Sequence, residues 1–281
     1  MTNEHFNERS MRPSKIVLQL ILGIALVMGS GAGARAQGEI TLLAVGPMRA
    51  PTQKIVDSFQ AKTGYKVKVT YGNGAETRRT VAKGQPLDVS LIIAPFPGAL
   101  ASGSIVLSSA TTVANILTGV AVPKGRPKPD ISTPAAVKKA LLAAKSIGYE
   151  DPDFTVAGQG PWEVLNKLGI ADQVSSKSQV ELGPGAAGIS PSATNNAIKT
   201  AKRLEDGNIE IGLLMLSDML PDKDKYDIVG VLPRKICTPI PVVGFISTHA
   251  SDPAGAKALL EFLASPEAGA IWKDAGYEPH K

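Results

Sequence analysis

The chain has 281 residues with 30 Lys and Arg against 25 Asp and Glu, and this small excess, without a basic cluster, argues against a nucleic-acid-binding protein. Because only 5% of the residues are aromatic, neither a sugar-stacking groove nor an aromatic cage for quaternary amines is expected. The single cysteine, Cys237, excludes an intrachain disulfide, and its apolar neighbours Ile236 and Ile240 favour a buried structural thiol over a reactive one.

Residues 1–36 have the pattern of a secretory signal peptide. Basic residues precede an apolar run over 16–28, and small residues follow it up to a cleavage site after Ala36. The apolar run is short for a membrane span, so cleavage is favoured over a retained anchor. We therefore expect a mature protein that begins near Gln37, resides in the periplasm as a monomer and has no stable membrane insertion.

The first part of the mature chain alternates apolar runs with helical patterns. Strands are expected at 40–45, 65–71 and 87–93, and helices at 51–62 and 76–83. In the first helix Ile55, Val56 and Phe59 share one face, and Gly64 is a typical helix end. This βαβαβ order predicts parallel strands joined by crossover helices.

A second α/β series follows a proline-rich stretch at about 120–129. Helices are expected at 135–145, 192–204, 253–263 and 266–275, and another is opened by 158–161, with Pro161 suited to the first helical position, and runs to about 168. Strands are expected at 146–149 and 209–216, and an extended segment at 238–246. The proline-rich segments 120–129 and 233–241 are suitable interdomain crossings. We predict an α/β fold with two lobes, 37–121 plus 242–281 and 122–241, joined by a hinge of two crossing segments. The alternative is one α/β domain with a long inserted loop.

Two strand-to-helix turns in the first lobe are suited to an anion. A helix start offers unpaired N–H groups and a partial positive charge. An arginine fork matches a carboxylate with two hydrogen bonds, so Arg49 and Arg78 favour a small organic acid. The alternative is that Arg78 and Arg79 lie on a solvated helix face. The candidate ligand-binding residues of these turns are Pro47, Met48, Arg49, Asn73, Gly74 and Arg78.

The second lobe offers further helix starts. Gly158, Thr194 and Asn195 are candidates to direct donors at the same ligand, although helix capping alone would explain the latter two. His249 and His280 lack metal-ligand spacing, and no phosphate-binding loop or nucleophile motif is present, so neither a metal nor a cofactor is expected.

Six segments occur in an order that is typical of one protein family. They are 56–67, 84–91, 122–125, 204–207, 217–218 and 258–268. With them the chain resembles the molybdate-binding family of periplasmic substrate-binding proteins for ABC importers. The resemblance implies the type II periplasmic binding protein fold, with a small ligand in the cleft between two hinged lobes and an ABC permease as partner.

The expected ligand positions depart from that family. It usually places small Ser residues after the first two strands and a Tyr before the Ser-Asp pair, where this chain has Pro47, Asn73 or Gly74, and Met215. Missing hydroxyls argue against molybdate, whereas the added charges favour a small carboxylate. Met215 is retained as a candidate ligand contact.

An enzyme is the alternative function. Aconitate isomerases are related to the same family, and an arginine-lined pocket would suit their small unsaturated tricarboxylate. Glu76 is the candidate catalytic base for that reaction if burial raises its pKa. Otherwise Glu76 stabilises a helix N-terminus as a first-turn acid. A third possibility is a sensor-type binder without a transporter.

Overall fold

A computed structural model describes residues 38–153, 155–181 and 194–280, with side chains left undescribed at 194–198. The expected signal peptide lies outside these residues. Residues 38–281 form one compact unit, which is the part discussed below. Among the described residues, no helix has the length and apolar character needed to cross a membrane.

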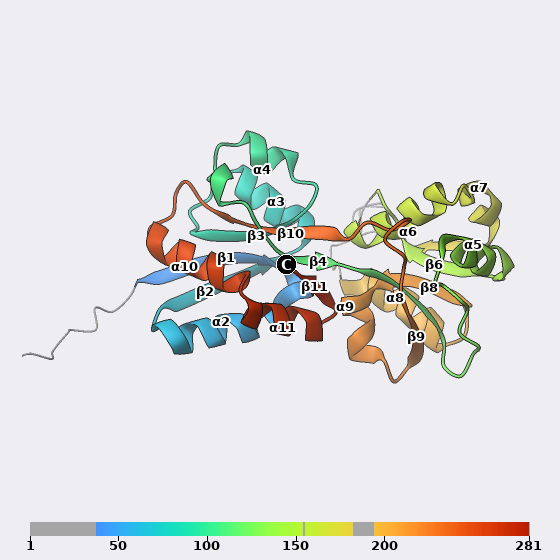
Figure 1. The fold of residues 1–281 in the computed structure, drawn as a ribbon. Helices are drawn as coiled ribbons and strands as arrows, with labels where there is room; N and C mark the ends of the chain where they lie inside the picture. The colour runs from blue at the N-terminus through green and yellow to red at the C-terminus, as the bar shows by residue number, and fades with distance from the viewer. Residues whose placement is uncertain (1–37, 154, 182–193, 281) are drawn as a thin grey trace, which may run out of the picture. The chain divides into compact units, whose positions relative to one another are not determined.

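The first sheet combines the beginning and the end of the described part of the chain (Figure 1). Within the described residues its strand order is β11-β4-β10-β3-β1-β2. The strands are β1 (Glu39–Val45), β2 (Lys66–Gly72), β3 (Val89–Ile93), β4 (Thr111–Ile116), β10 (Ile240–Ile246) and β11 (Tyr277–Pro279). As predicted, β1 runs parallel to β2 and β3, whereas β10 is antiparallel to β3 and β4.

Seven helical segments within the described residues are associated with this sheet. They are η1 (Gly46–Met48), α2 (Arg49–Thr63), α3 (Gly74–Ala82), α4 (Pro97–Ala101), η2 (Leu107–Ser109), α10 (Pro253–Leu263) and α11 (Pro266–Asp274). In α2 the predicted face of Ile55, Val56 and Phe59 is buried. The helix ends at Gly64, whose φ of 78° is the left-handed conformation that favours glycine.

The second sheet has the order β7-β6-β8-β5-β9 within the described residues. Its strands are β5 (Thr118–Pro123), β6 (Ile147–Glu150), β7 (Ser178–Glu181), β8 (Ile211–Met215) and β9 (Tyr226–Val231). The associated helices are α5 (Pro134–Ala143), α6 (Val156–Lys167), α7 (Ala171–Val174), η3 (Ser175–Lys177), α8 (Thr194–Glu205), α9 (Leu216–Met219) and η4 (Leu220–Asp222). Because β6 is parallel to both β7 and β8, the carboxyl ends of these three strands meet at one edge.

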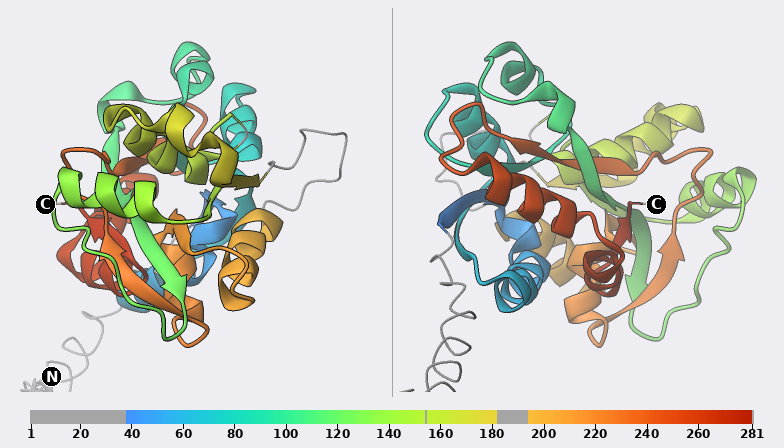
Figure 2. Two further views of the ribbon diagram at one scale, coloured as in Figure 1. Left: turned by 90° about the vertical axis from the view of Figure 1, so that its right-hand side faces the viewer. Right: turned by 60° about the vertical axis from the view of Figure 1, so that its left-hand side comes forward.

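Two segments connect the sheets, and each can be followed by its colour in Figure 2. The chain leaves the first sheet after β4 and enters the second at Thr118, a few residues before the boundary expected at 121/122. It returns after β9 and enters β10 at Ile240, close to the boundary expected at 241/242. The crossings start side by side, since Ile240 pairs with Ile116.

The expected start of the helix at 158–168 is wrong. Helix α6 begins at Val156, and Pro161 lies inside it rather than at its first position. The reason is the N-cap: the Thr155 hydroxyl accepts the Gly158 N–H at 3.1 Å and starts the helix earlier. A Cβ atom on Gly158 would overlap the Glu150 carbonyl oxygen, so close packing explains this glycine.

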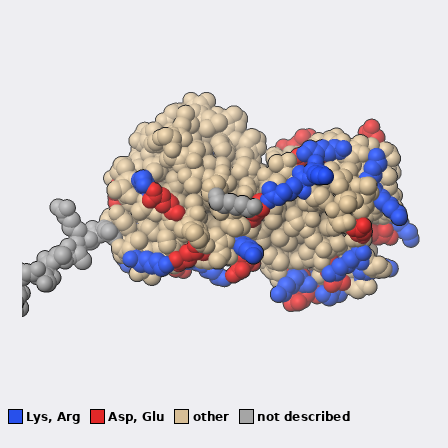
Figure 3. Space-filling model, viewed as in Figure 1, with Lys and Arg blue, Asp and Glu red and all other residues tan. Residues whose placement is uncertain are grey.

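Surface charge is mixed on the face shown in Figure 3. Lysine and arginine side chains alternate with acidic ones, and neither sign forms a continuous field there. Ion pairs between exposed side chains, such as Lys62–Glu267 and Lys202–Asp206, also occur in the described part of the chain. This face therefore lacks the concentrated basic patch typical of a phosphate-backbone contact.

Candidate functional site

A cavity of about 480 Å³ is lined by strand and helix ends from both sheets. The first sheet contributes η1, the start of α3 and β11, and the second contributes β6, the start of α6, β8 and α9. The predicted residues that line it are Pro47, Met48, Asn73, Gly74, Arg78 and Met215. The two strand-to-helix turns identified in the sequence therefore reach one cavity.

A capping box builds the start of α3. The Asn73 side chain accepts the Glu76 N–H at 2.8 Å, and the Glu76 carboxylate accepts the Asn73 N–H at 3.4 Å. Glu76 is exposed and is not among the cavity-lining residues, so its position matches the helix-stabilising alternative. Gly74 and Ala75 do line the cavity, and first-turn amides like theirs have no partner within the helix.

Arg78 and Arg79 give this side of the cavity its positive charge. Arg78 is half-buried, and its Nη1 donates to the Ile93 carbonyl oxygen at 3.5 Å. Desolvation lowers the pKa of Arg78, and the charge of Arg79 adds to this effect. Arg79 is exposed but also lines the cavity, so the solvated-face alternative describes only part of its surroundings.

Arg49 has a different position from the other predicted residues. Its guanidinium group lies 4.0 Å from the centre of the Tyr71 ring, a cation–π contact on the exposed side of α2. It is not among the residues that line the cavity. Of the two arginines predicted as ligand contacts, Arg78 therefore lines the cavity and Arg49 does not.

The second sheet contributes another capped helix start. Thr155, Val156 and Ala157 line the cavity at the beginning of α6. Gly158 does not, and its N–H is engaged by the Thr155 hydroxyl. Thr194 and Asn195 begin α8, but their side chains lie outside the described part of the structure.

Three acidic residues that the sequence reasoning missed also line the cavity: Glu150 at the end of β6, Asp218 just after β8, and Asp222 of η4, which is paired with Lys225. Glu150 is only 4% exposed, and this burial is the main cause that raises its pKa to about 7. A hydrogen bond from Thr155 lowers the pKa, and the charge of Glu181 raises it by a smaller amount. Burial also raises the pKa of Asp218 to about 7, with the Glu150 charge as the second cause. The pKa values of Glu150 and Asp218 are therefore both raised well above those of ordinary carboxyl groups.

Hydroxyl groups complete the lining. Ser217 and Tyr277 line the cavity, the latter because β11 pairs with β4 and places it there. Burial raises the pKa of Tyr277, so this phenol remains protonated, and it donates to the Pro47 carbonyl oxygen at 3.5 Å. Neutral donors are therefore present, although not at the sequence positions where the resemblance led us to expect them.

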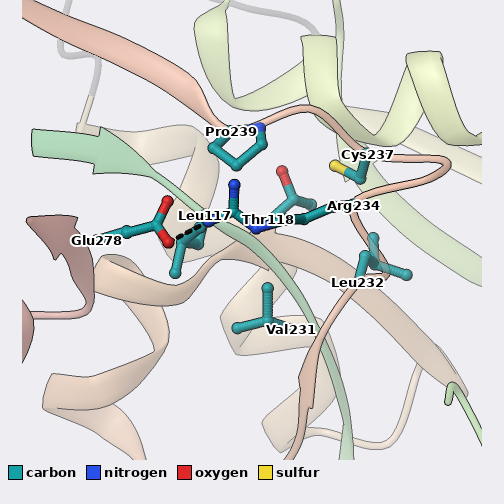
Figure 4. A pocket seen from close by; sticks show the side chains of 8 residues that line it. All are labelled: Leu117, Thr118, Val231, Leu232, Arg234, Cys237, Pro239 and Glu278. Carbon is teal, nitrogen blue, oxygen red and sulfur yellow. Dashed lines mark hydrogen bonds and ion pairs between the residues drawn. The ribbon is translucent and has the colours of Figure 1, made fainter. Parts of the chain in front are cut away.

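A smaller pocket of about 210 Å³ lies at the return crossing (Figure 4). Cys237 and Pro239 line it, together with an ion pair between Arg234 and Glu278 of β11. Cys237 is free and 5% exposed, and burial raises the pKa of its thiol. The prediction of a buried structural thiol is confirmed, because a catalytic thiol requires the opposite change of pKa.

Comparison with known proteins identifies the family. The family model described as bacterial extracellular solute-binding protein matches residues 40–278. The chain belongs to this family. Solute-binding proteins bind small ligands and work with ABC transporters, so the predicted resemblance is confirmed at this level.

Individual members of the family differ in what they do. The chain is 25% identical over 246 residues to an aconitate isomerase from Pseudomonas sp, covering 85% of this chain and 87% of that protein. It is also 25% identical over 272 residues to the molybdate-binding protein ModA of Rhodobacter capsulatus, covering 96% and 97%. A solved substrate-binding domain from Clostridium difficile has a TM-score of 0.74 at 18% identity and covers 87% of this chain and 100% of that one. The predicted two-lobed α/β fold is confirmed.

Proposed function

We propose that this solute-binding protein captures a small organic anion in the periplasm and delivers it to an ABC importer. The observation that supports this proposal is the convergence of Arg78, Arg79 and the free amides of Gly74 and Ala75 on one cavity. A volume of about 480 Å³ is within the usual range for small-molecule sites. Capture requires lobe closure about the two crossings and no covalent chemistry.

A carboxylate fits this cavity better than a tetrahedral oxyanion does. The arginine fork forms paired hydrogen bonds with a planar carboxylate. Pro47 and Met215, which replace family hydroxyl positions, offer no side-chain donor to an oxyanion. Among the hydroxyls of the lining, that of Ser217 has no hydrogen-bond partner within the described residues and is available to a larger acid, whereas Thr155 donates to the Asp151 carbonyl and Tyr277 to the Pro47 carbonyl.

A thermal-shift screen tests this function. We expect citrate, tricarballylate or succinate to raise the Tm, since a ligand at about 100 times its Kd adds about 2.7 kcal/mol of stability. For a domain of this size that corresponds to about 5–10 °C. Arg78→Ala should abolish the shift, whereas Arg126→Ala, in an exposed loop, should retain it. If molybdate alone raises the Tm, the carboxylate assignment is wrong, and if no anion does, the binding function is wrong.

A second function, isomerisation of a small unsaturated tricarboxylate, is favoured by Glu150 and Asp218. A double-bond shift needs a base that removes a proton from the carbon next to the double bond and an acid that returns one to its far carbon. Two carboxyl groups that titrate near pH 7 in one cavity could do both, and they replace the exposed Glu76 as candidates. Incubation of cis-aconitate with the purified protein, followed by NMR, should then produce the trans isomer. An unchanged spectrum excludes this second function.

A further inference from the structure

The pairing of two strands brings Glu150 and Asp218 together. In the parallel pair β6–β8, Ile147 lies opposite Ile211 and Gly148 opposite Gly212, so the carboxyl ends of both strands reach the same edge. Glu150 is the last residue of β6, and Asp218 lies in α9, which follows β8 directly. Both side chains line the large cavity, and the charge of Glu150 acts on Asp218.

Neither carboxyl group forms an ion pair within residues 38–153, 155–181 and 194–280. The nearby Arg203 is engaged with Glu181, its Nε lying 3.0 Å from Oε1. The other titratable or charged groups around the pair and along the cavity are Arg78, Arg79, Glu181, Asp222, Tyr226 and Tyr277.

This environment favours a proton on the pair. The charge of Glu181 acts on Glu150 although Glu181 is paired with Arg203, and Asp222, which also lines the cavity, is paired with Lys225 at 2.8 Å. The buried Glu150 and the partly exposed Asp218 have no direct cation among the described residues, so they cannot both ionise readily, because desolvation and the charge of Glu150 oppose it. Protonation relieves the repulsion and turns one group into a hydrogen-bond donor.

We propose that the Glu150–Asp218 pair holds one proton and donates it, as a hydrogen bond, to a second carboxylate of the ligand, so that the protein captures a di- or tricarboxylate together with a proton. This inference rests on the proposed binding function. One carboxylate of the ligand pairs with Arg78 and Arg79, and the other accepts from the acid pair. A ligand with an amine in place of the second carboxylate would instead drive the proton off.

Calorimetry with tricarballylate provides the test, because this saturated acid cannot isomerise and its carboxyl groups are already ionised at about pH 7.5. Titrations in two buffers with different ionisation enthalpies give the number of protons exchanged. We expect an uptake of about one proton at pH 8 and an affinity that falls about tenfold per pH unit above neutrality. Binding with no uptake, or with proton release, overturns the proposal.

Variants separate the acid pair from the rest of the site. Glu150→Gln keeps a donor that cannot ionise, so binding should persist and its pH dependence above neutrality should be lost. Asp218→Asn is the second variant, in case the first does not fold. Glu163→Gln is the matched control, since Glu163 does not line the cavity and its carboxylate accepts from Thr238 at 2.7 and 2.8 Å. Equal pH dependence in all these proteins overturns the proposal.

The free protein allows a test that does not depend on any ligand. Carbon-13 NMR of the side-chain carboxyl groups should show one proton lost from the pair near neutral pH, and Asp218→Asn should simplify that titration. If both groups ionise below about pH 5, the proposal is overturned even if a carboxylate binds. If the pair titrates near neutrality but no carboxylate binds, the binding function fails and the ligand part of the proposal fails with it.

Discussion

Replacing Glu150 by Gln should remove a pH-dependent loss of stability. In the unfolded chain this carboxyl group ionises near its ordinary value of 4.5, whereas in the folded protein burial raises its pKa to about 7. Between these values the folded state binds more protons than the unfolded state, so the free energy of unfolding falls as the pH rises. The difference corresponds to about 3 kcal/mol at pH 8, of which about 2.5 kcal/mol develops above pH 5.

Urea unfolding of wild type and Glu150→Gln at pH 5, 6.5 and 8 measures this effect. The variant should gain about 2–3 kcal/mol relative to wild type between pH 5 and pH 8. Any pH-independent effect of the new amide cancels in this comparison. The fully buried Trp272 provides a fluorescence signal for loss of the core.

Glu163→Gln is a control of opposite sign. Burial alone would raise the pKa of Glu163, but hydrogen bonds from Lys167 and Thr238 outweigh it and hold the pKa low. Its stabilising contribution is present above its ordinary pKa and is lost as the pH falls, so this variant should lose stability mainly at pH 8. If Glu150→Gln and wild type instead change in parallel within about 0.5 kcal/mol, Glu150 is ionised in the folded protein and the reasoning is refuted.

Three further predictions concern stability, each measured by urea unfolding. Gly160→Ala should lower the free energy of unfolding by about 1–3 kcal/mol, because the new Cβ would overlap the Thr118 hydroxyl. An unchanged free energy of unfolding would mean that Thr118 and β5 shift to make room for the Cβ at little cost. Asn73→Ala should lower it by about 1 kcal/mol through loss of the cap on the Glu76 N–H, and Asn73→Ser should restore most of that. Asp88→Asn should lower the free energy of unfolding by about 2 kcal/mol at pH 7 and by less at pH 3. Burial alone would raise the pKa of Asp88, but hydrogen bonds from Thr41 and Ser251 outweigh it and hold the pKa low. Equal losses at both pH values would contradict the low pKa of Asp88.

Local hydrophobic patterns were sufficient to predict most of the first sheet and its helices. The observed bounds of β1, α2, α10 and α11 lie within about two residues of the prediction, because each has a clear apolar face and a glycine or proline boundary. Strands β4 and β11 were missed for a different reason. Thr111–Ile116 has no regular alternation, and Tyr277–Pro279 is short, so both are strands only through pairing with distant segments.

The candidate site was predictable only in part, for the same reason. The anion-suited turns at Pro47 and Asn73 follow strands that are recognisable from local sequence, and both line the cavity. Nothing local distinguishes Arg49, held over Tyr71, from Arg78, which lines the cavity. In the sequence, Glu150 is only an acid that follows a short apolar run. Its place at the cavity depends on the pairing of β6 with β8, in which Ile147 lies opposite Ile211, 64 residues later in the chain.

The acid pair also explains how this cavity could discriminate among anions that share the arginine side. A tetrahedral oxyanion paired with Arg78 and Arg79 is compact and fills little of a volume of about 480 Å³. It would leave the carboxyl pair buried and unmatched, at the cost that an unpaired buried polar group brings. A di- or tricarboxylate can reach both sides at once, so that Glu150 gains an acceptor for its proton while the arginines keep their carboxylate. On this reasoning selectivity comes from the unfavourable burial of Glu150 and Asp218, which only a ligand with a second acceptor relieves.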